Sequence, residues 1–295
     1  MMRKSGYLKA AVVLALCALF LAGCGDKADK DKEAASKNEF RIPDSLLSPL
    51  DGYKLVRDEY HPVRGGVMAS KDIEVRYPAA PVARYIAVKI FGYALEAYRK
   101  VDETVGRPAD GSIVLIGATD LDEYKLVTRK EWWYYGLVKG DTIYFEPFNI
   151  MIKRTIAEMG LTQKIAQAAL ARRSKGRIPM WLKESLASYI AGEYEILEMQ
   201  AEQFRHENAN LDPSPADIEE ALEKAEDFRN TRIAFFAAYR MLENFLNRFS
   251  FETIFEFIDE LGAGRTLDEA AEKVFGMDYG SVIDAIRVDR PGESK

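Results

Sequence analysis

The sequence predicts an α+β protein that is mainly α-helical, with a small α/β lobe followed by a larger helical lobe. Short strand-like runs are found before residue 148, and amphipathic helical spacing dominates after it. A chain of 295 residues with 48% hydrophobic residues can bury a substantial core. We therefore expect an α/β lobe at residues 42–148 and a helical lobe at residues 149–290, with two short segments before them.

The first of these segments, residues 1–23, has the features of a secretory signal peptide. Arg3 and Lys4 precede an apolar run, Ala10 to Leu21, that is short for a membrane-spanning helix. The end of this run, Leu21-Ala22-Gly23-Cys24, resembles the lipobox of bacterial lipoproteins. The resemblance implies cleavage before Cys24, acylation of its thiol by a chain such as palmitate and of its new amino group, and a lipid anchor in the cell envelope, with the body facing the periplasm or the exterior. An uncleaved signal anchor with an incidental cysteine is the alternative.

The second segment, residues 24–41, is expected to be a flexible tether. Its central part, Asp26 to Asn38, is highly charged and has no apolar residue larger than alanine, so it cannot bury itself. The formal net charge of the whole chain is −6. Cleavage of the leader would remove three cations and make the body more negative. A negative body is a poor partner for nucleic acid, which selects basic patches.

The α/β lobe is expected to contain three strands and one long helix. The predicted strands are Ile73–Tyr77, Ser112–Gly117 and Thr142–Phe145. The predicted helix is Ala83–Val105, which has apolar residues at amphipathic spacing and is stopped by Gly106-Arg107-Pro108.

Four adjacent aromatic residues, Trp132 to Tyr135, lie between the last two predicted strands. They are interpreted either as a platform for a ligand or as filling for the core or the lobe interface, which is the more frequent role of such clusters. His61 precedes Pro62 in a loop-like context, which favours a surface or capping position over a ligand position.

The helical lobe begins with two predicted helices joined by a basic connector. The first is Arg154–Arg173, and the second is opened by Pro179, at a position where a missing N–H costs little. The expected inward face of the second helix is Trp181, Leu182, Leu186, Tyr189 and Ile190. Further helices are expected to start at Ser214-Pro215 and to span Thr231–Phe249, Phe251–Leu261, Leu267–Phe275 and Tyr279–Ile286.

Two stretches of this lobe, Gln163-Lys164-Ile165-Ala166-Gln167 and Pro179 to Tyr189, resemble the gluzincin metallopeptidases. In that family an HExxH helix supplies two zinc-binding histidines and a catalytic glutamate, and a glutamate from the next helix completes the site. The resemblance, which extends over about residues 73–286, places Gln163 and Gln167 at the histidine positions, Lys164 at the base and Glu184 at the third ligand. The alternative is an accidental likeness between two ordinary packed helices.

These replacements remove the chemistry that the family uses. A carboxamide is a poor zinc ligand beside imidazole, and a charged lysine neither accepts a proton from water nor tolerates a nearby dication. The chain has two histidines, His61 and His206, so a site with three histidines is impossible within one chain. Its two cysteines, Cys17 and Cys24, leave no pair after the leader. We therefore expect no catalytic residue, no metal and no cofactor.

Without a cation beside it, a buried Glu184 would need a counter-charge. We expect Lys164 to supply it in an ion pair, with Gln163 and Gln167 hydrogen-bonded around the pair. The alternative is that Lys164 points to solvent.

Two classes of function follow from this sequence. The first is a membrane-tethered, non-catalytic protein that keeps a peptidase-like cleft for an extended peptide or a protein partner, with Trp132, Trp133 and Trp181 as candidate anchors. The second is an active hydrolase with an unconventional site. A structural envelope component would differ from the first class in having no ligand in the cleft.

Overall fold

The computed structural model describes residues 55–80, 82–193 and 213–287. The predicted signal peptide, Cys24, the predicted tether and His206 lie outside these residues. The described residues belong to one compact unit, Ile42–Lys295. In the described part of the chain, none of the helices has both the length and the apolar character needed to cross a bilayer.

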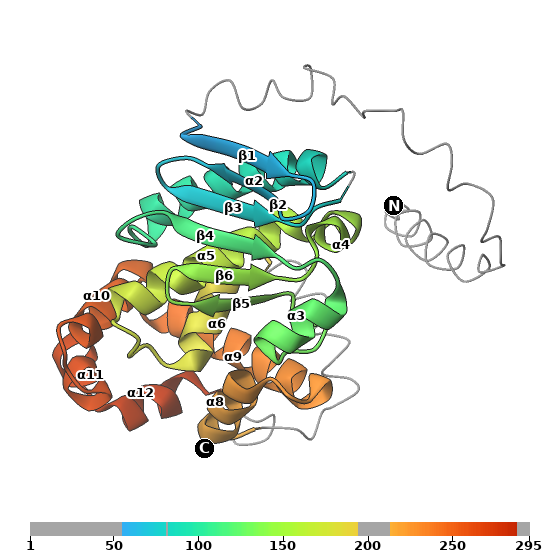
Figure 1. Cartoon of the computed structure of the whole chain (residues 1–295). Helices are drawn as coiled ribbons and strands as arrows, with labels where there is room; N and C mark the ends of the chain where they lie inside the picture. The colour runs from blue at the N-terminus through green and yellow to red at the C-terminus, as the bar shows by residue number, and fades with distance from the viewer. Residues whose placement is uncertain (1–54, 81, 194–212, 288–295) are drawn as a thin grey trace, which may run out of the picture. The chain divides into compact units, whose positions relative to one another are not determined.

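A small sheet comes first and helices follow, which confirms the predicted α+β, mainly α fold class (Figure 1). The described strands are β1 (Arg57–His61), β2 (Gly65–Ala69), β3 (Ile73–Tyr77), β4 (Ile113–Gly117), β5 (Gly136–Lys139) and β6 (Thr142–Phe145). They form a six-stranded sheet in the order β1-β2-β3-β4-β6-β5. The β3/β4 and β4/β6 pairs are parallel, and the other pairs are antiparallel.

The sequence located the three central strands of this sheet and missed β1, β2 and β5. The central strands have buried residues in alternation, as in Ile73, Val75 and Tyr77 of β3. In contrast, every residue of β1 is exposed, so this edge strand has no hydrophobic pattern. In β2, Gly66 lies opposite Tyr77, and a Cβ atom at this position would lie 2.2 Å from the ring of Tyr77. The glycine therefore lets the tyrosine ring cross the neighbouring strand.

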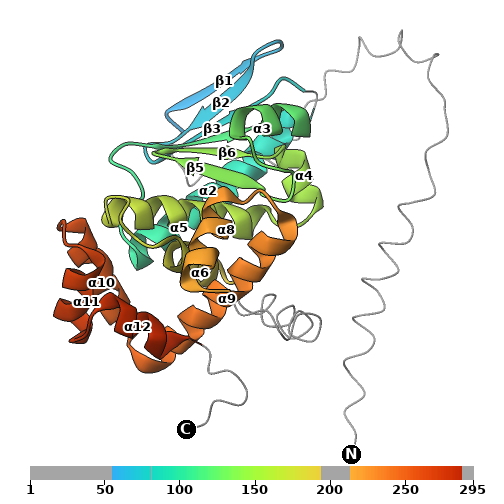
Figure 2. The same cartoon turned by 90° about the horizontal axis from the view of Figure 1, so that it is seen from below.

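Three helices lie against one face of the sheet: α2 (Ala83–Thr104), α4 (Phe148–Lys153) and α5 (Ala157–Arg173) (Figure 2). The helix predicted at 154–173 starts three residues later, because Arg154 and Thr155 form a turn after α4. Thr155 has a left-handed φ of 57°, which a continuous helix does not allow. The short α3 (Leu121–Thr128) follows β4 and is capped by the side chain of Asp120.

The remaining described helices are α6 (Met180–Ala191), α8 (Pro215–Lys224), α9 (Phe228–Arg248), α10 (Phe251–Gly262), α11 (Leu267–Phe275) and α12 (Tyr279–Ile286). The cap at Ser214 is confirmed, since this residue and Asp217 form a reciprocal capping box. Helix α9 starts three residues earlier than predicted because Asp227 caps it, accepting a 2.7 Å hydrogen bond from the backbone nitrogen of Asn230.

One hydrophobic core runs through both predicted lobes and contains side chains from the sheet and from the helices. Helix α5 lies at its centre and packs against α2, α6 and β5. Its residues from Gly160 to Leu170 are all buried, including three long polar side chains. Polar groups are costly to bury without partners, so this helix marks the place to look for a site.

Candidate functional site

The three buried polar residues of α5 are Gln163, Lys164 and Gln167, and Glu184 of α6 is buried beside them. These four side chains, which we call the polar cluster, are the positions that were singled out from the sequence. Gln167 follows Lys164 by three residues and Gln163 by four, so these three side chains come from neighbouring turns of α5, and Glu184 approaches them from α6. The structure thus brings the four residues together.

A chain of hydrogen bonds joins three members of the polar cluster. The Nζ atom of Lys164 donates to Oε1 of Gln167 over 3.2 Å. The Nε2 atom of Gln167 donates in turn to Oε2 of Glu184 over 2.6 Å. The expected direct ion pair between Lys164 and Glu184 is not formed between these two described residues, because the carboxamide of Gln167 lies between the charges.

Lys164 is buried rather than directed to solvent, with 3% of its surface exposed. Its Nζ atom lies 4.6 Å from the ring centre of Tyr134 and 5.2 Å from that of Tyr135, in cation–π geometry. Gly136 allows this approach, since a Cβ atom there would lie 3.0 Å from Cγ of Lys164. Burial lowers the pKa of Lys164, and the charges of Glu184 and Glu193 oppose this shift.

Gln163 connects the polar cluster to a second buried carboxylate, Glu193, which is 8% exposed. The Nε2 atom of Gln163 donates to Oγ of Ser188 over 2.6 Å and to Oε2 of Glu193 over 3.2 Å. The hydroxyl of Tyr135 donates to Oε1 of Gln163 and, over 3.3 Å, to Oε1 of Glu193. Burial raises the pKa of Glu193, and hydrogen bonds from Ser188 and Tyr135 together with the charge of Lys164 counteract the rise.

Glu193 was not singled out from the sequence. The signal that could have identified it is the preceding Gly192, which ends α6 in a left-handed conformation with φ 83°. This turn lets the next residue fold back toward α5.

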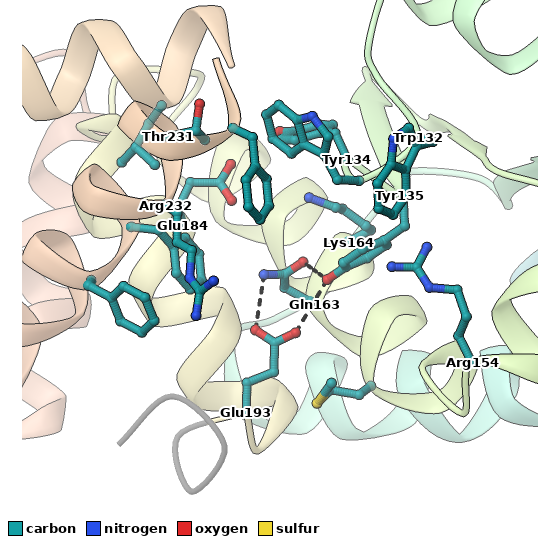
Figure 3. Close-up of a pocket in the computed structure, with 16 residues that line it drawn as sticks. Trp132, Tyr134, Tyr135, Arg154, Gln163, Lys164, Glu184, Glu193, Thr231 and Arg232 are labelled. Carbon is teal, nitrogen blue, oxygen red and sulfur yellow. Dashed lines mark hydrogen bonds between the residues drawn. The ribbon is translucent and has the colours of Figure 1, made fainter. Parts of the chain in front are cut away.

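Three members of the polar cluster, Gln163, Lys164 and Glu184, form the floor of a cleft together with Glu193 (Figure 3). The cleft has a volume of about 470 Å³. The walls come from the loop before β5 and from α9, and they are mainly aromatic. The lining residues used below are Trp132, Trp133, Tyr134, Phe228, Phe235 and Phe236. Arg154 and Arg232 lie on opposite sides of this space (Figure 3).

The aromatic segment before β5 packs across the cleft with one ring and exposes another at the cleft edge. Trp133 packs against Phe228 of α9 with ring centres 5.5 Å apart, which joins the sheet side of the cleft to the helical side. Trp132 is 57% exposed at the cleft edge, with the guanidinium of Arg154 5.7 Å from its ring centre. Arg154 is held by the buried Glu146, which accepts bonds of 2.9 and 3.0 Å from Nη1.

Trp181 does not line the cleft, and the expectation that it anchors a ligand there is wrong. It is 2% exposed, packs on Phe245 of α9, and donates from Nε1 to the hydroxyl of Tyr279 over 2.9 Å. Its contacts with α9 and α12 direct Trp181 into the core of the helical part and not into the cleft. Tyr189 also departs from the expected inward face, being 39% exposed.

His61 is exposed at the end of β1, where its Nδ1 atom accepts a 3.1 Å hydrogen bond from the backbone of Val63. In the part of the chain that the structure describes, no group of three or more His, Cys, Asp or Glu side chains is placed to hold a metal ion. The polar cluster itself does not fit zinc. Its two amides are hydrogen-bonded to neighbouring side chains, and its ammonium group would repel a dication.

In comparisons of this sequence with known proteins, no protein-family profile and no curated protein matches the chain.

Proposed function

We propose that this chain is a lipid-anchored protein of the bacterial cell envelope whose peptidase-like cleft binds an extended segment of a peptide or protein without hydrolysing it. The observation that supports this proposal best is the pairing of an aromatic cleft with the polar cluster at its floor. Three of the positions that would hold zinc and the catalytic base in a gluzincin are instead joined to one another by hydrogen bonds.

The carboxylates of the cleft already accept hydrogen bonds from neighbouring side chains. Glu184 accepts a short hydrogen bond from Gln167, and Glu193 accepts from Gln163 and Tyr135. A general base needs a free lone pair within reach of the water that it deprotonates. At the position where a gluzincin would have its base, this chain has the buried Lys164, which favours binding over hydrolysis.

The walls of the cleft have the apolar and aromatic composition of a ligand-binding pocket. Ligand pockets are mostly apolar, with a few polar groups that fix orientation, and their usual volumes of roughly 300–1,000 Å³ include the value found here. Trp132 is exposed at the edge, so a ligand side chain can cover it and remove apolar surface from water. An extended peptide segment with aromatic or aliphatic side chains matches this chemistry.

The proposed anchor rests on the lipobox-like Leu21-Ala22-Gly23-Cys24. Acyl chains contribute roughly 0.8 kcal/mol per buried CH₂, so several chains on Cys24 would hold the protein stably on a bilayer. The predicted tether of residues 24–41 would then let the cleft reach partners away from the lipid surface.

The proposal is tested by titrating the full chain, purified in mild detergent, with a library of unstructured peptides that differ in aromatic content. We expect saturable binding of aromatic peptides, weakened severalfold by Trp132→Ala and unchanged by an exposed control substitution such as Glu103→Gln on α2. A casein cleavage assay and elemental analysis are run on the same preparation. Stoichiometric metal with chelator-sensitive cleavage would support the active hydrolase instead, and the absence of peptide binding by the folded chain would also contradict the proposal.

A further inference from the structure

Lys164 has a feature that peptide binding does not use. Its amine is at the floor of the cleft and points into the space between the aromatic walls (Figure 3). An ammonium group has three N–H donors. Among the described residues, one side chain accepts a hydrogen bond from this amine: Gln167, through Oε1 at 3.2 Å. The rest of its surroundings are the faces of Tyr134 and Tyr135.

A buried amine with these surroundings is suited to nucleophilic chemistry. Lysine becomes a nucleophile when a hydrophobic site removes its hydration and favours the uncharged form. Burial has the largest effect on the pKa of Lys164 and lowers it. The charges of Glu184 and Glu193 oppose this shift, and the weaker effects of Lys183 and Lys130 act in the same direction as burial. The cleft keeps the amine reachable by a ligand, although its own side chain is almost fully covered.

We propose that Lys164 forms an imine with an aldehyde or ketone that carries an aromatic group, and that the cleft is a site for such carbonyl compounds. The amine nitrogen attacks the carbonyl carbon to give a carbinolamine. Loss of water then forms the C=N bond, so that amine and carbonyl compound give imine and water. No oxidant or reductant is needed.

The neighbouring groups match the hydrogen-bonding needs of this product. A protonated imine has one N–H, and Gln167 provides one acceptor at the place where it would lie. Its positive charge would be stabilised by the two tyrosine rings and, through Gln167, by Glu184. The reaction needs no net proton, because the two hydrogens that the amine loses leave with the carbonyl oxygen as water.

The walls select the carbonyl compound. The rings of Trp133, Phe228 and Phe235 line the cleft, so an aromatic group attached to the carbonyl would be covered on several sides. A small hydrophilic aldehyde lacks this contact and is expected to react less. The inference does not depend on peptide binding, since a cleft that ignores peptides could still form the imine.

The test uses the folded full chain in mild detergent with substoichiometric benzaldehyde and sodium cyanoborohydride, which reduces imines to stable amines. Peptide mapping by mass spectrometry then locates the label. We expect severalfold more label on Lys164 than on exposed lysines, and loss of this enrichment when the chain is unfolded in guanidinium before labelling. Lys164→Arg keeps the charge but removes the nucleophile, so it should abolish the enriched label. Lys183→Arg, which changes a lysine outside the cleft lining, should leave it unchanged.

Two results would overturn the inference. One is an even distribution of label over the exposed lysines of the folded wild-type chain, with no enrichment at Lys164. The other is equal labelling of Lys164 by acetaldehyde and benzaldehyde, which would show that the aromatic walls select nothing. Circular dichroism of each variant establishes that the compared chains are folded.

Discussion

The side chain of Gln167 donates a 2.6 Å hydrogen bond to the carboxylate of Glu184 and accepts one from Lys164 over 3.2 Å. This carboxamide therefore joins α5 to α6 and separates two buried charges that would otherwise meet directly. In the gluzincin arrangement that the sequence resembles, the same positions would share a cation. Under the proposed resemblance, the charge of Lys164 would take the place of that cation.

Removing the charge of Lys164 should destabilise the fold. In Lys164→Met, the buried carboxylates of Glu184 and Glu193 lose their nearby cation, and the loss of a partner for buried polar groups typically costs about 1–3 kcal/mol. We expect a lower free energy of unfolding in urea at pH 7. The control Lys183→Met changes a partly exposed residue of α6 and should have a smaller effect. Equal stability of Lys164→Met and wild type would show that the ammonium does not serve the carboxylates.

Glu193 predicts a particular dependence of stability on pH. Its pKa is raised by burial from an ordinary value of 4.5, so the native state retains this proton where the unfolded chain has lost it. The stability that it contributes is fully present below the unfolded pKa and is lost as the pH rises through the folded pKa. The Glu193→Gln variant has no carboxyl group to titrate at this position. The free energy of unfolding of the variant minus that of wild type should therefore increase as the pH is raised from 4 toward 8.

Urea unfolding of both proteins across this pH range measures the effect. Glu103→Gln, an exposed substitution on α2, is the matched control and should show a much flatter difference. A difference between Glu193→Gln and wild type that stays constant with pH would mean that the carboxyl titrates as it does in the unfolded chain.

The tryptophans should divide into one binding residue and one core residue. Trp181→Phe loses the hydrogen bond to Tyr279 and some packing against Phe245, so it should lower the free energy of unfolding by about 1–3 kcal/mol while a folded sample keeps its peptide affinity. Trp132→Ala should weaken peptide binding and leave the free energy of unfolding nearly unchanged. Denaturation and peptide titration of both variants check this, and weakened peptide binding by the folded Trp181→Phe chain alone would reverse the assignment.

Membrane attachment should depend on Cys24. We expect Cys24→Ala to move from the membrane fraction to the aqueous fraction on detergent phase separation and to lose incorporation of labelled palmitate. Cys17→Ala provides the matched control, because that cysteine lies within the predicted leader and should not matter. Unchanged membrane partition of Cys24→Ala would instead favour an uncleaved signal anchor.

Patterns local to the sequence predicted most of the fold. Helices with a capping signal at their start, such as those after Ser214 and Thr266, and strands with clear alternation, such as β3, were located correctly or nearly so. Strand β1 was missed because its side chains are all exposed and show no periodicity. The break before α5 was missed because a threonine in the left-handed region has no compositional signal.

The site was predicted in part. The resemblance to gluzincins selected the four members of the polar cluster, because the spacing usual in that family was counted back from Glu184 along the two expected helices. It could not show that Gln167 would lie between Lys164 and Glu184, because that depends on side-chain length and orientation across two helices. Nor could it place Trp181, whose direction is set by packing against α9 and by the distant Tyr279.

The central claim is that α5 and α6 keep the arrangement of a gluzincin site with its ligands replaced. The most direct test restores those ligands in the triple variant Gln163→His, Lys164→Glu and Gln167→His and measures its zinc content by elemental analysis after dialysis. We predict stoichiometric zinc in the triple variant, little in wild type, and loss of the metal when Glu184→Gln is added. A folded triple variant that binds no zinc, or that binds it equally well without Glu184, would contradict this account.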